Sequence, residues 1–134
     1  MTNTPQKRIR FDQAETTRQD DERCHVEVTL SFADRVLKAS AAEPCEGVGP
    51  LKAAARAALE AMEEAVEGRF RCKLADLDHV NALGKNLIAV LVDIDFEGKQ
   101  VQVFGSCQLS GNEIDAAVKA ALNATNRFFD LAQK

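Results

Sequence analysis

The sequence contains an internal repeat, and this repeat constrains the fold more than any other feature. The segment 51–59, LKAAARAAL, is matched 63 residues later by IDAAVKAAL over 114–122. Each copy of such a unit carries an apolar face that it cannot bury alone, so the copies must pack on each other or on a second chain. We therefore predict two pseudo-repeats, the first over about 6–66 and the second over about 69–130.

Length and composition are those of a globular protein. The 134 residues favour a single domain over 1–134, and a content of 46% apolar and 28% charged residues argues against disorder. The net charge of −4 argues against nucleic acid and anionic membranes as partners, because no basic surplus exists to neutralise phosphates. No run of about 18 apolar residues and no signal segment occurs, so we expect a cytoplasmic protein.

The four cysteines, Cys24, Cys45, Cys72 and Cys107, are widely spaced and form no CxxC or CxxH pair. Zinc sites usually place two ligands that close together. We therefore expect reduced, mostly buried thiols, no metal and no other cofactor. A metal site assembled from cysteine and histidine stays open, but the spacing does not support it.

Alternating apolar and polar residues predict a β-hairpin before each repeated helix. Residues 26–32 alternate and lead through a turn at 33–34 into a strand around 35–41. In the second copy, 88–96 alternate, and a turn containing glycine leads into a returning strand over 100–105.

A further strand is expected at the start of each copy, near 7–12 and at 70–77. Residues 12–23 are polar and charged, and we expect them to form a long, mobile connection. The predicted fold is α+β, with two βββα pseudo-repeats and an antiparallel sheet in each copy covered on one face by its helix.

The two helices have clear start signals. Proline suits a first helical turn, so the first helix is expected to begin at Pro50, and 110–113 (SGNE) has the spacing of a capping box before the second. The surface of the first helix is formed largely by small side chains, because the helix contains Ala53, Ala54, Ala55, Ala57, Ala58 and Ala61. Such a surface indicates either close packing within the chain or a homodimer surface formed by a helix or a sheet.

No arrangement typical of catalysis is present. His25 and His79 are expected to be surface or structural residues, and Asp93 and Asp95 share one solvated strand face. The fingerprints of serine hydrolases, zinc proteases, P-loops and dinucleotide-binding folds are absent from the sequence. We therefore expect no enzyme activity.

Loops that lead into the helices are better candidates for a site. Gly47 and Gly49 lie against a helix N-terminus, where free N–H groups and the positive end of the dipole attract a carboxylate or phosphate. The segment Gly105–Gly111 holds the equivalent place in the second copy. Two such loops suggest a pseudo-symmetric ligand site, although tight turns alone also favour glycine.

These residues resemble a known family. The segment 47–53, GVGPLKA, is similar to the GxGPxxA motif of the C-terminal regulatory, or dimerisation, domain of 2-isopropylmalate synthases and citramalate synthases. The segment 114–127 is similar to that family's second helix and shares its Asn-Arg ending. The resemblance covers nearly the whole chain and implies the same paired βββα architecture.

The resemblance also implies a homodimer that binds leucine or isoleucine and acts on a synthase catalytic subunit. Backbone N–H groups of the loops are expected to hold the carboxylate, with an apolar wall for the branched side chain. The implied site residues are Gly47, Val48, Gly49, Pro50, Leu51, Gly105, Gly111 and Ile114. The sequence departs from the family at 74–77, LADL rather than LxDY, and at 112–115, NEID rather than the usual DII.

The sequence is compatible with three functions to different degrees. The first is a stand-alone regulatory domain that dimerises, binds a small amino acid and acts on a separately encoded synthase. The alternative is a pure dimerisation or adaptor module with no ligand pocket. An enzyme is the least supported, because the synthase catalytic barrel does not fit within 134 residues.

Overall fold

The computed structural model describes residues 8–18 and 20–132. Three strands and a helix follow one another twice along the chain. The first unit consists of β1 (Arg10–Arg18), β2 (Arg23–Phe32), β3 (Arg35–Pro44) and α1 (Gly49–Ala65), and the second of β4 (Phe70–Ala82), β5 (Lys85–Phe96), β6 (Lys99–Gln108) and α2 (Glu113–Ala132). The predicted α+β fold with two βββα units is confirmed.

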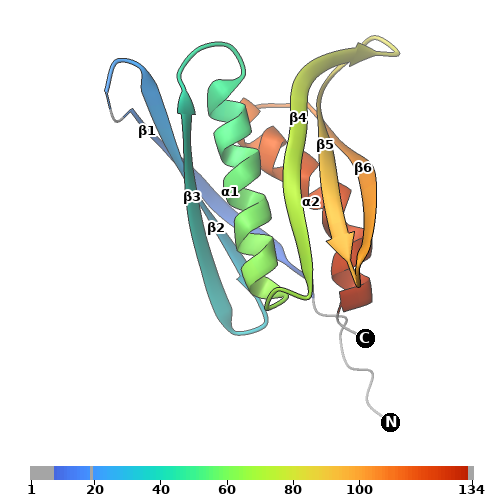
Figure 1. The fold of residues 1–134 in the computed structure, drawn as a ribbon. Helices are drawn as coiled ribbons and strands as arrows, with labels where there is room; N and C mark the ends of the chain where they lie inside the picture. Colours follow the sequence, from blue (N-terminus) through green and yellow to red (C-terminus); the bar gives the residue numbers. More distant parts are fainter. Residues whose placement is uncertain (1–7, 19, 133–134) are drawn as a thin grey trace.

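Both helices lie between two three-stranded sheets (Figure 1). One sheet has the strand order β1-β2-β3 and the other β4-β5-β6, and both are antiparallel. α1 packs on β2 and β3 and also contacts β4, whereas α2 packs on β5 and β6, and the two helices contact each other. Each unit therefore buries its apolar face against the other unit. Within the described residues, no helix covers the outer face of either sheet.

Both hairpins form at the predicted positions. β2 turns into β3 at Ala33, whose φ is 56°, and β5 turns into β6 through Glu97 and Gly98, with φ values of 53° and 79°. Two successive positive φ values match the right-handed twist of the flanking strands, which is why glycine suits the second position. β4 begins at Phe70 as predicted and continues beyond the predicted end to Ala82.

The first strand forms, but its predicted bounds are wrong. Lys7, where the strand was expected to begin, lies outside the described residues, and the expected mobile connection over 12–23 is mostly strand: β1 pairs with β2 as far as Arg18. Polar residues tolerate this position because β1 is an edge strand whose side chains are mostly exposed. Asp20 then closes the turn, because its Oδ1 accepts hydrogen bonds at 2.8 Å from the N–H groups of Glu22 and Arg23.

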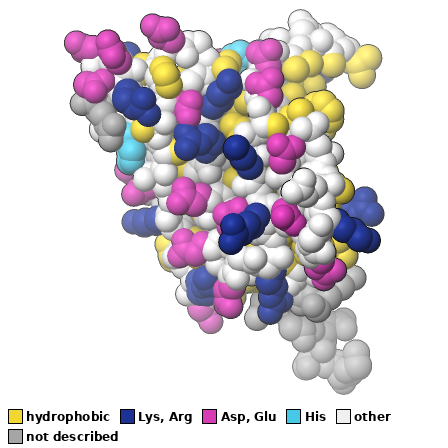
Figure 2. All heavy atoms as spheres, in the orientation of Figure 1, with side chains coloured by type: hydrophobic (Ala, Val, Ile, Leu, Met, Phe, Trp, Pro, Cys, Tyr) yellow, Lys and Arg dark blue, Asp and Glu magenta, His cyan; other side chains and the backbone are white. Residues whose placement is uncertain are grey.

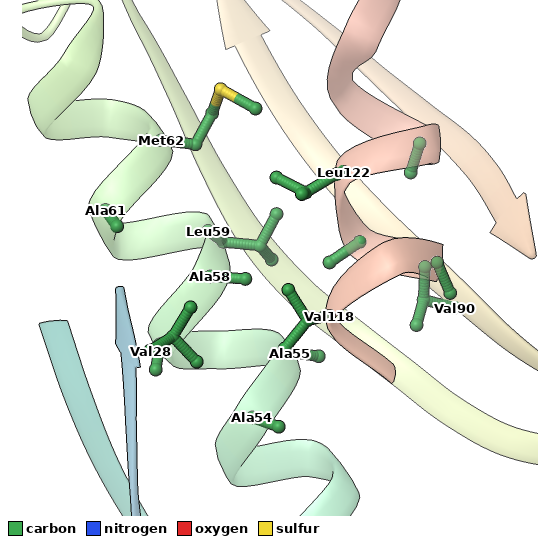
Figure 3. Close-up of a cluster of buried hydrophobic side chains, with 14 of the residues drawn as sticks. Val28, Ala54, Ala55, Ala58, Leu59, Ala61, Met62, Val90, Val118 and Leu122 are labelled. Atoms are coloured by element: carbon green, nitrogen blue, oxygen red, sulfur yellow. The ribbon is translucent and has the colours of Figure 1, made fainter. Parts of the chain in front are cut away.

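The alanines of α1 serve packing within the chain. Ala54, Ala55 and Ala58 are fully buried and point into a cluster with Val28 of β2 and Val118 of α2 (Figure 3). A helix that is covered by a sheet on one side and by a helix on another has room only for small side chains. These alanines are therefore not available to a second copy, which excludes the α1 version of the predicted dimer surface. Among the described residues, no helix is long and apolar enough to cross a membrane.

The prediction of four thiols is wrong for one pair. Cys24 and Cys45 form a disulfide, with their Cα atoms 5.1 Å apart. They lie 21 residues apart in sequence, but pairing of β2 with β3 places Arg23 opposite Pro44 and so brings the two cysteines together. Cys72 and Cys107 are free and partly buried.

Candidate functional site

The loop before α1 has the backbone geometry that glycine permits. Gly47 has a φ of 56°, in the left-handed region. Gly49 packs so closely on the end of β3 that an added Cβ would lie 1.7 Å from the carbonyl oxygen of Pro44, and its N–H donates to Glu46 O at 2.9 Å. The loop is therefore held in place by its own backbone.

This loop leaves the N-terminus of α1 without a cap. Val48 occupies the N-cap position and has no side-chain oxygen to accept a hydrogen bond, and no acidic residue lies in the first turn. Pro50 has no N–H, and the N–H of Leu51 has no hydrogen-bond partner among the described residues. The positive end of the α1 dipole is therefore uncompensated, which suits an anion.

The N-terminus of α2 differs, and the predicted capping box is wrong. Asn112, not Ser110, caps the helix: its Oδ1 accepts hydrogen bonds from the N–H groups of Ile114 at 2.7 Å and Asp115 at 3.4 Å. Glu113 and Asp115 add negative charge in the first turn. The two helix N-termini are equivalent in the repeat, but of the two only that of α1 lacks both a side-chain cap and an acidic residue in its first turn.

The two glycines of the second loop lie in different surroundings. Gly105 is buried in β6 opposite Val90, and an added Cβ would lie 2.2 Å from the carbonyl oxygen of Ala120 in α2. Gly111 has open space around it and borders a shallow depression of about 260 Å³ beside Asp115. Gly105 therefore sets the distance between β6 and α2, and only Gly111 belongs to the turn before the helix.

One side chain from the first turn of each helix reaches the same stretch of β4. Lys52 in the first turn of α1 lies 3.9 Å from Asp76, measured from Nζ to Oδ1, and His79 Nε2 lies 3.4 Å from Glu113 Oε1 in the first turn of α2. Figure 1 shows both helices starting at the same end of the molecule. Leu77 lies between these two contacts and is buried.

These contacts bring together residues that are distant in sequence. Lys52, which follows the loop over 47–51, and Glu113, which precedes the half-buried Ile114, each reach β4 beside Leu77. A register shift between Leu74 and Asp76 marks a bulge in this stretch. The contact of Lys52 with Asp76 was not predicted from the sequence, because it joins one copy of the repeat to the other. The only available signal was the LADL segment that departs from the family pattern.

A larger depression lies away from this point. It has a volume of about 710 Å³ and is lined by charged and amide side chains on the outer face of the second sheet, including Arg71, Lys73, Asp93, Asp95, Gln100 and Gln102. Asp93 and Asp95 are exposed, as predicted for a solvated strand face. Its charges alternate in sign on a solvated surface, which is ordinary for such a face.

Features typical of a catalytic or metal site are lacking in the described part of the chain. Three or more potential metal ligands do not cluster there. Burial, and secondarily the charge of Glu63, raises the pKa of the Cys72 thiol to about 12, so this cysteine is a poor nucleophile. The described residues therefore show no nucleophile or metal cluster of the kind that catalysis uses.

Comparison with known families identifies a regulatory domain. A family model described as the LeuA allosteric (dimerisation) domain matches residues 1–129. A search of curated proteins found no match. The matched model covers most of the chain, and its description is that of a regulatory domain.

Proposed function

Because this chain belongs to the LeuA allosteric (dimerisation) domain family, we propose that it forms a homodimer and binds a branched-chain amino acid. The effector is leucine or isoleucine. It binds where the N-termini of α1 and α2 flank β4, and its binding is transmitted to a synthase of leucine or isoleucine biosynthesis.

The main support is that one side chain from the first turn of each helix reaches one stretch of β4. Lys52 and Glu113, one from each first turn, contact Asp76 and His79 of this strand. Of the two helices, α1 has neither a side-chain cap nor an acidic residue in its first turn. A carboxylate at this position would accept a hydrogen bond from the N–H of Leu51. Its charge would also compensate the positive end of the α1 dipole.

A free amino acid carries both of the charges that this position can bind. Its α-carboxylate would lie at the N-terminus of α1 beside the Lys52 ammonium, and its α-ammonium beside the Asp76 carboxylate. These two side chains are 38% and 70% exposed, so a solute can reach both. Their exposed ion pair contributes less than about 1 kcal/mol to stability, so separating it for a ligand costs little.

The remaining site residues have distinct roles in this proposal. The loop over 47–50 presents the helix N-terminus, while half-buried Val48 and Ile114 offer apolar surface to the branched side chain. Gly105 holds α2 close to β6, and Gly111 gives the turn before α2 its shape. Leu51 is buried and supports this apolar surface from the interior. An apolar pocket distinguishes side chains that differ by one methylene by about 1–3 kcal/mol, enough to separate leucine from valine.

The proposed partner is the catalytic subunit of a synthase whose pathway ends in leucine or isoleucine. A biosynthetic partner of this kind places the domain in the cytoplasm. There the domain would act as a sensor: occupancy of the β4 site would report the concentration of the end product to the synthase.

Isothermal titration calorimetry with leucine and isoleucine tests the site. Asp76→Asn keeps the side-chain oxygen that accepts the Leu77 N–H but removes the charge, and Lys52→Ala removes the ammonium. Each change is expected to weaken binding at least about tenfold, which is about 1.4 kcal/mol. Lys38→Ala, an exposed lysine on β3, is the matched control and should bind as the unchanged protein does. Equal affinity in all four proteins would refute this placement.

A dimerisation or adaptor module without a pocket remains a second candidate because of Leu77. This residue occupies the tyrosine position of the LxDY pattern and is 2% exposed. If its side chain fills the space that a ligand would need, no amino acid will bind. A dimer that gives no heat with any of the 20 amino acids would select this second function.

A further inference from the structure

We propose that the free edge of β6 is a docking site for an extended peptide of another protein, which adds to the second sheet as a fourth strand next to β6. The inference goes beyond the proposed amino-acid site and does not depend on it. The peptide is recognised chiefly through its own backbone, by the mode known as β-augmentation.

Each sheet has two edge strands, and three of these four strands carry features that prevent a further strand from pairing. β1 and β4 each contain a bulge and several charged residues. β3 contains charged residues and ends in Pro44. Figure 2 shows charged side chains distributed over the surface that these three strands present in this view. Bulges, charges and proline are the usual protection of an edge strand against pairing with other chains.

β6 lacks all three kinds of protection. It pairs with β5 in an unbroken register from Lys99 to Gln108. After Lys99 its sequence, QVQVFGSCQ over 100–108, contains no charged residue and no proline. Figure 1 shows β6 at the edge of the second sheet, with β5 on one side only. β6 is therefore the edge of this fold at which the sequence leaves the addition of a strand possible.

The backbone groups of β6 point alternately toward β5 and toward the free edge. In an antiparallel pair, the N–H and C=O of every second residue face the partner strand, and those of the residues between them face away. The N–H of Leu109, just after β6, donates to Asn86 O of β5 at 2.8 Å. The N–H of Ser106 instead donates to Asn123 Oδ1 of α2 at 3.2 Å. Even-numbered residues of β6 therefore face the free edge, and Asn123 closes this edge at Ser106.

The rest of this edge is open. By the same alternation, Gln100, Gln102 and Phe104 direct their N–H and C=O groups away from β5. These main-chain groups have no hydrogen-bond partner within the described part of the chain. Alternating donors and acceptors with this spacing match the backbone of one more extended strand.

Apolar side chains flank the open stretch on both faces of the sheet. Phe104 is 77% exposed on the outer face, and Val101 is 42% exposed on the side of the helices, beside half-buried Val103. A strand next to β6 would cover all three, because cross-strand neighbours on one face lie about 5 Å apart. The preferred peptide therefore has β-branched or aromatic residues and no proline in the paired stretch.

The length of the open edge favours a peptide over a second copy of this chain. The stretch 100–104 spans roughly 17 Å of strand. A stable dimer buries about 800 Å² on each partner, from about 20–30 residues a side, which an edge of this length does not supply. A peptide needs less surface, because main-chain hydrogen bonds give the affinity and neighbouring side chains give the specificity.

Amide hydrogen exchange followed by NMR, with and without a synthetic peptide, tests the site. In the probe, valine and threonine alternate over five residues between two lysines, and both ends are blocked. Saturation is expected to slow exchange at Gln100, Gln102 and Phe104 by at least about tenfold. Ser106, which already donates to Asn123, should change little. No change at the first three amides, or slowing spread evenly over the chain, would overturn the placement.

Fluorescence anisotropy with the labelled peptide tests the edge by mutation. Gln102→Pro removes an N–H that faces the free edge and takes none from β5, so an edge strand tolerates it. It is expected to weaken binding at least about tenfold, because a peptide carbonyl loses its donor. Ser40→Pro is the matched control, since Ser40 is exposed on the edge strand β3 in the same alternation as Pro44. It should leave the affinity unchanged.

A second variant does not touch the backbone. Phe104→Ser removes apolar cover on the outer face and is expected to weaken binding about threefold. Far-ultraviolet circular dichroism confirms that each variant is folded. Equal affinity of the unchanged protein, Gln102→Pro and Phe104→Ser would overturn the proposal.

A modified peptide separates backbone pairing from other attraction. The same peptide N-methylated at its three central residues keeps its side chains and its charge but loses the central N–H groups, and it should not bind. Equal binding of both peptides would overturn strand addition. Sedimentation velocity without peptide tests the other occupant: self-association that Gln102→Pro abolishes would assign this edge to a second copy and overturn peptide docking.

Discussion

The disulfide between Cys24 and Cys45 ties the start of β2 to the segment that leads into α1. The N–H of Cys45 also donates to Glu22 O at 2.8 Å. The loop that presents the N-terminus of α1 therefore follows directly after a covalently fixed point.

Removing this crosslink is expected to destabilise the protein. A crosslink that closes a loop of this length typically stabilises by about 3 kcal/mol, chiefly by restricting the unfolded chain. Cys24→Ser combined with Cys45→Ser should therefore lower the midpoint of thermal unfolding by about 10 °C, and a reductant should do the same to the unchanged protein. Cys107→Ser, which removes a free thiol, is the control. A midpoint that does not respond to reductant would show that the crosslink contributes nothing.

Two of the glycines are expected to tolerate no side chain. Gly49→Ala would bring Cβ against Pro44 O, and Gly105→Ala would bring it against Ala120 O. Each should cost about 2 kcal/mol or more of unfolding free energy, because backbone must move to relieve the overlap. Gly111→Ala has open space and should change stability by less than about 0.5 kcal/mol. Urea unfolding measures all three, and similar losses in all would contradict the close approaches.

Deprotonation of the Cys72 thiol should lower the stability of the folded protein at alkaline pH. Burial raises the pKa of this thiol from an ordinary value of 9.0 to about 12 in the folded protein. Because the folded state binds this proton more tightly than the unfolded state, the free energy of unfolding keeps its full value below pH 9. It falls by about 1 kcal/mol per pH unit as the pH rises toward 12. Urea unfolding between pH 8 and 11 should therefore show a steeper loss for the unchanged protein than for Cys72→Ala. Parallel curves would contradict a buried, protonated thiol.

The N-cap of α2 offers a test that separates two neighbouring residues. Asn112→Ala removes the side-chain acceptor of the Ile114 N–H and should cost about 1 kcal/mol. Ser110→Ala removes the residue that the sequence pattern favoured and should cost almost nothing. Equal losses from the two variants would mean that the cap is shared.

Sequence reasoning succeeded where the repeat and the alternation carried the information. The period of the repeated helices predicted two βββα units, and the alternation over 26–32 and 88–96 predicted the two central strands. Both patterns are strong because these segments are buried on one side. β1 was placed wrongly because an edge strand with exposed side chains has no such pattern.

Contacts between distant segments were not predictable from one sequence. Cys24 meets Cys45 only because β2 pairs with β3 in a particular register. Lys52 meets Asp76 only because the two units pack through their helices. The candidate site lies at this second kind of contact, so its loop was predicted and its position against β4 was not.

Thermal unfolding by calorimetry in the presence of each amino acid tests the central claim most directly. The chain contains no Trp or Tyr, so its own fluorescence reports unfolding poorly. A ligand at about 100 times its dissociation constant adds about 2.7 kcal/mol of stability, which for a domain of this size raises the midpoint by several degrees. We expect such a rise with leucine or isoleucine and a smaller one with valine. No rise with any amino acid would contradict the account of this chain as an amino-acid sensor.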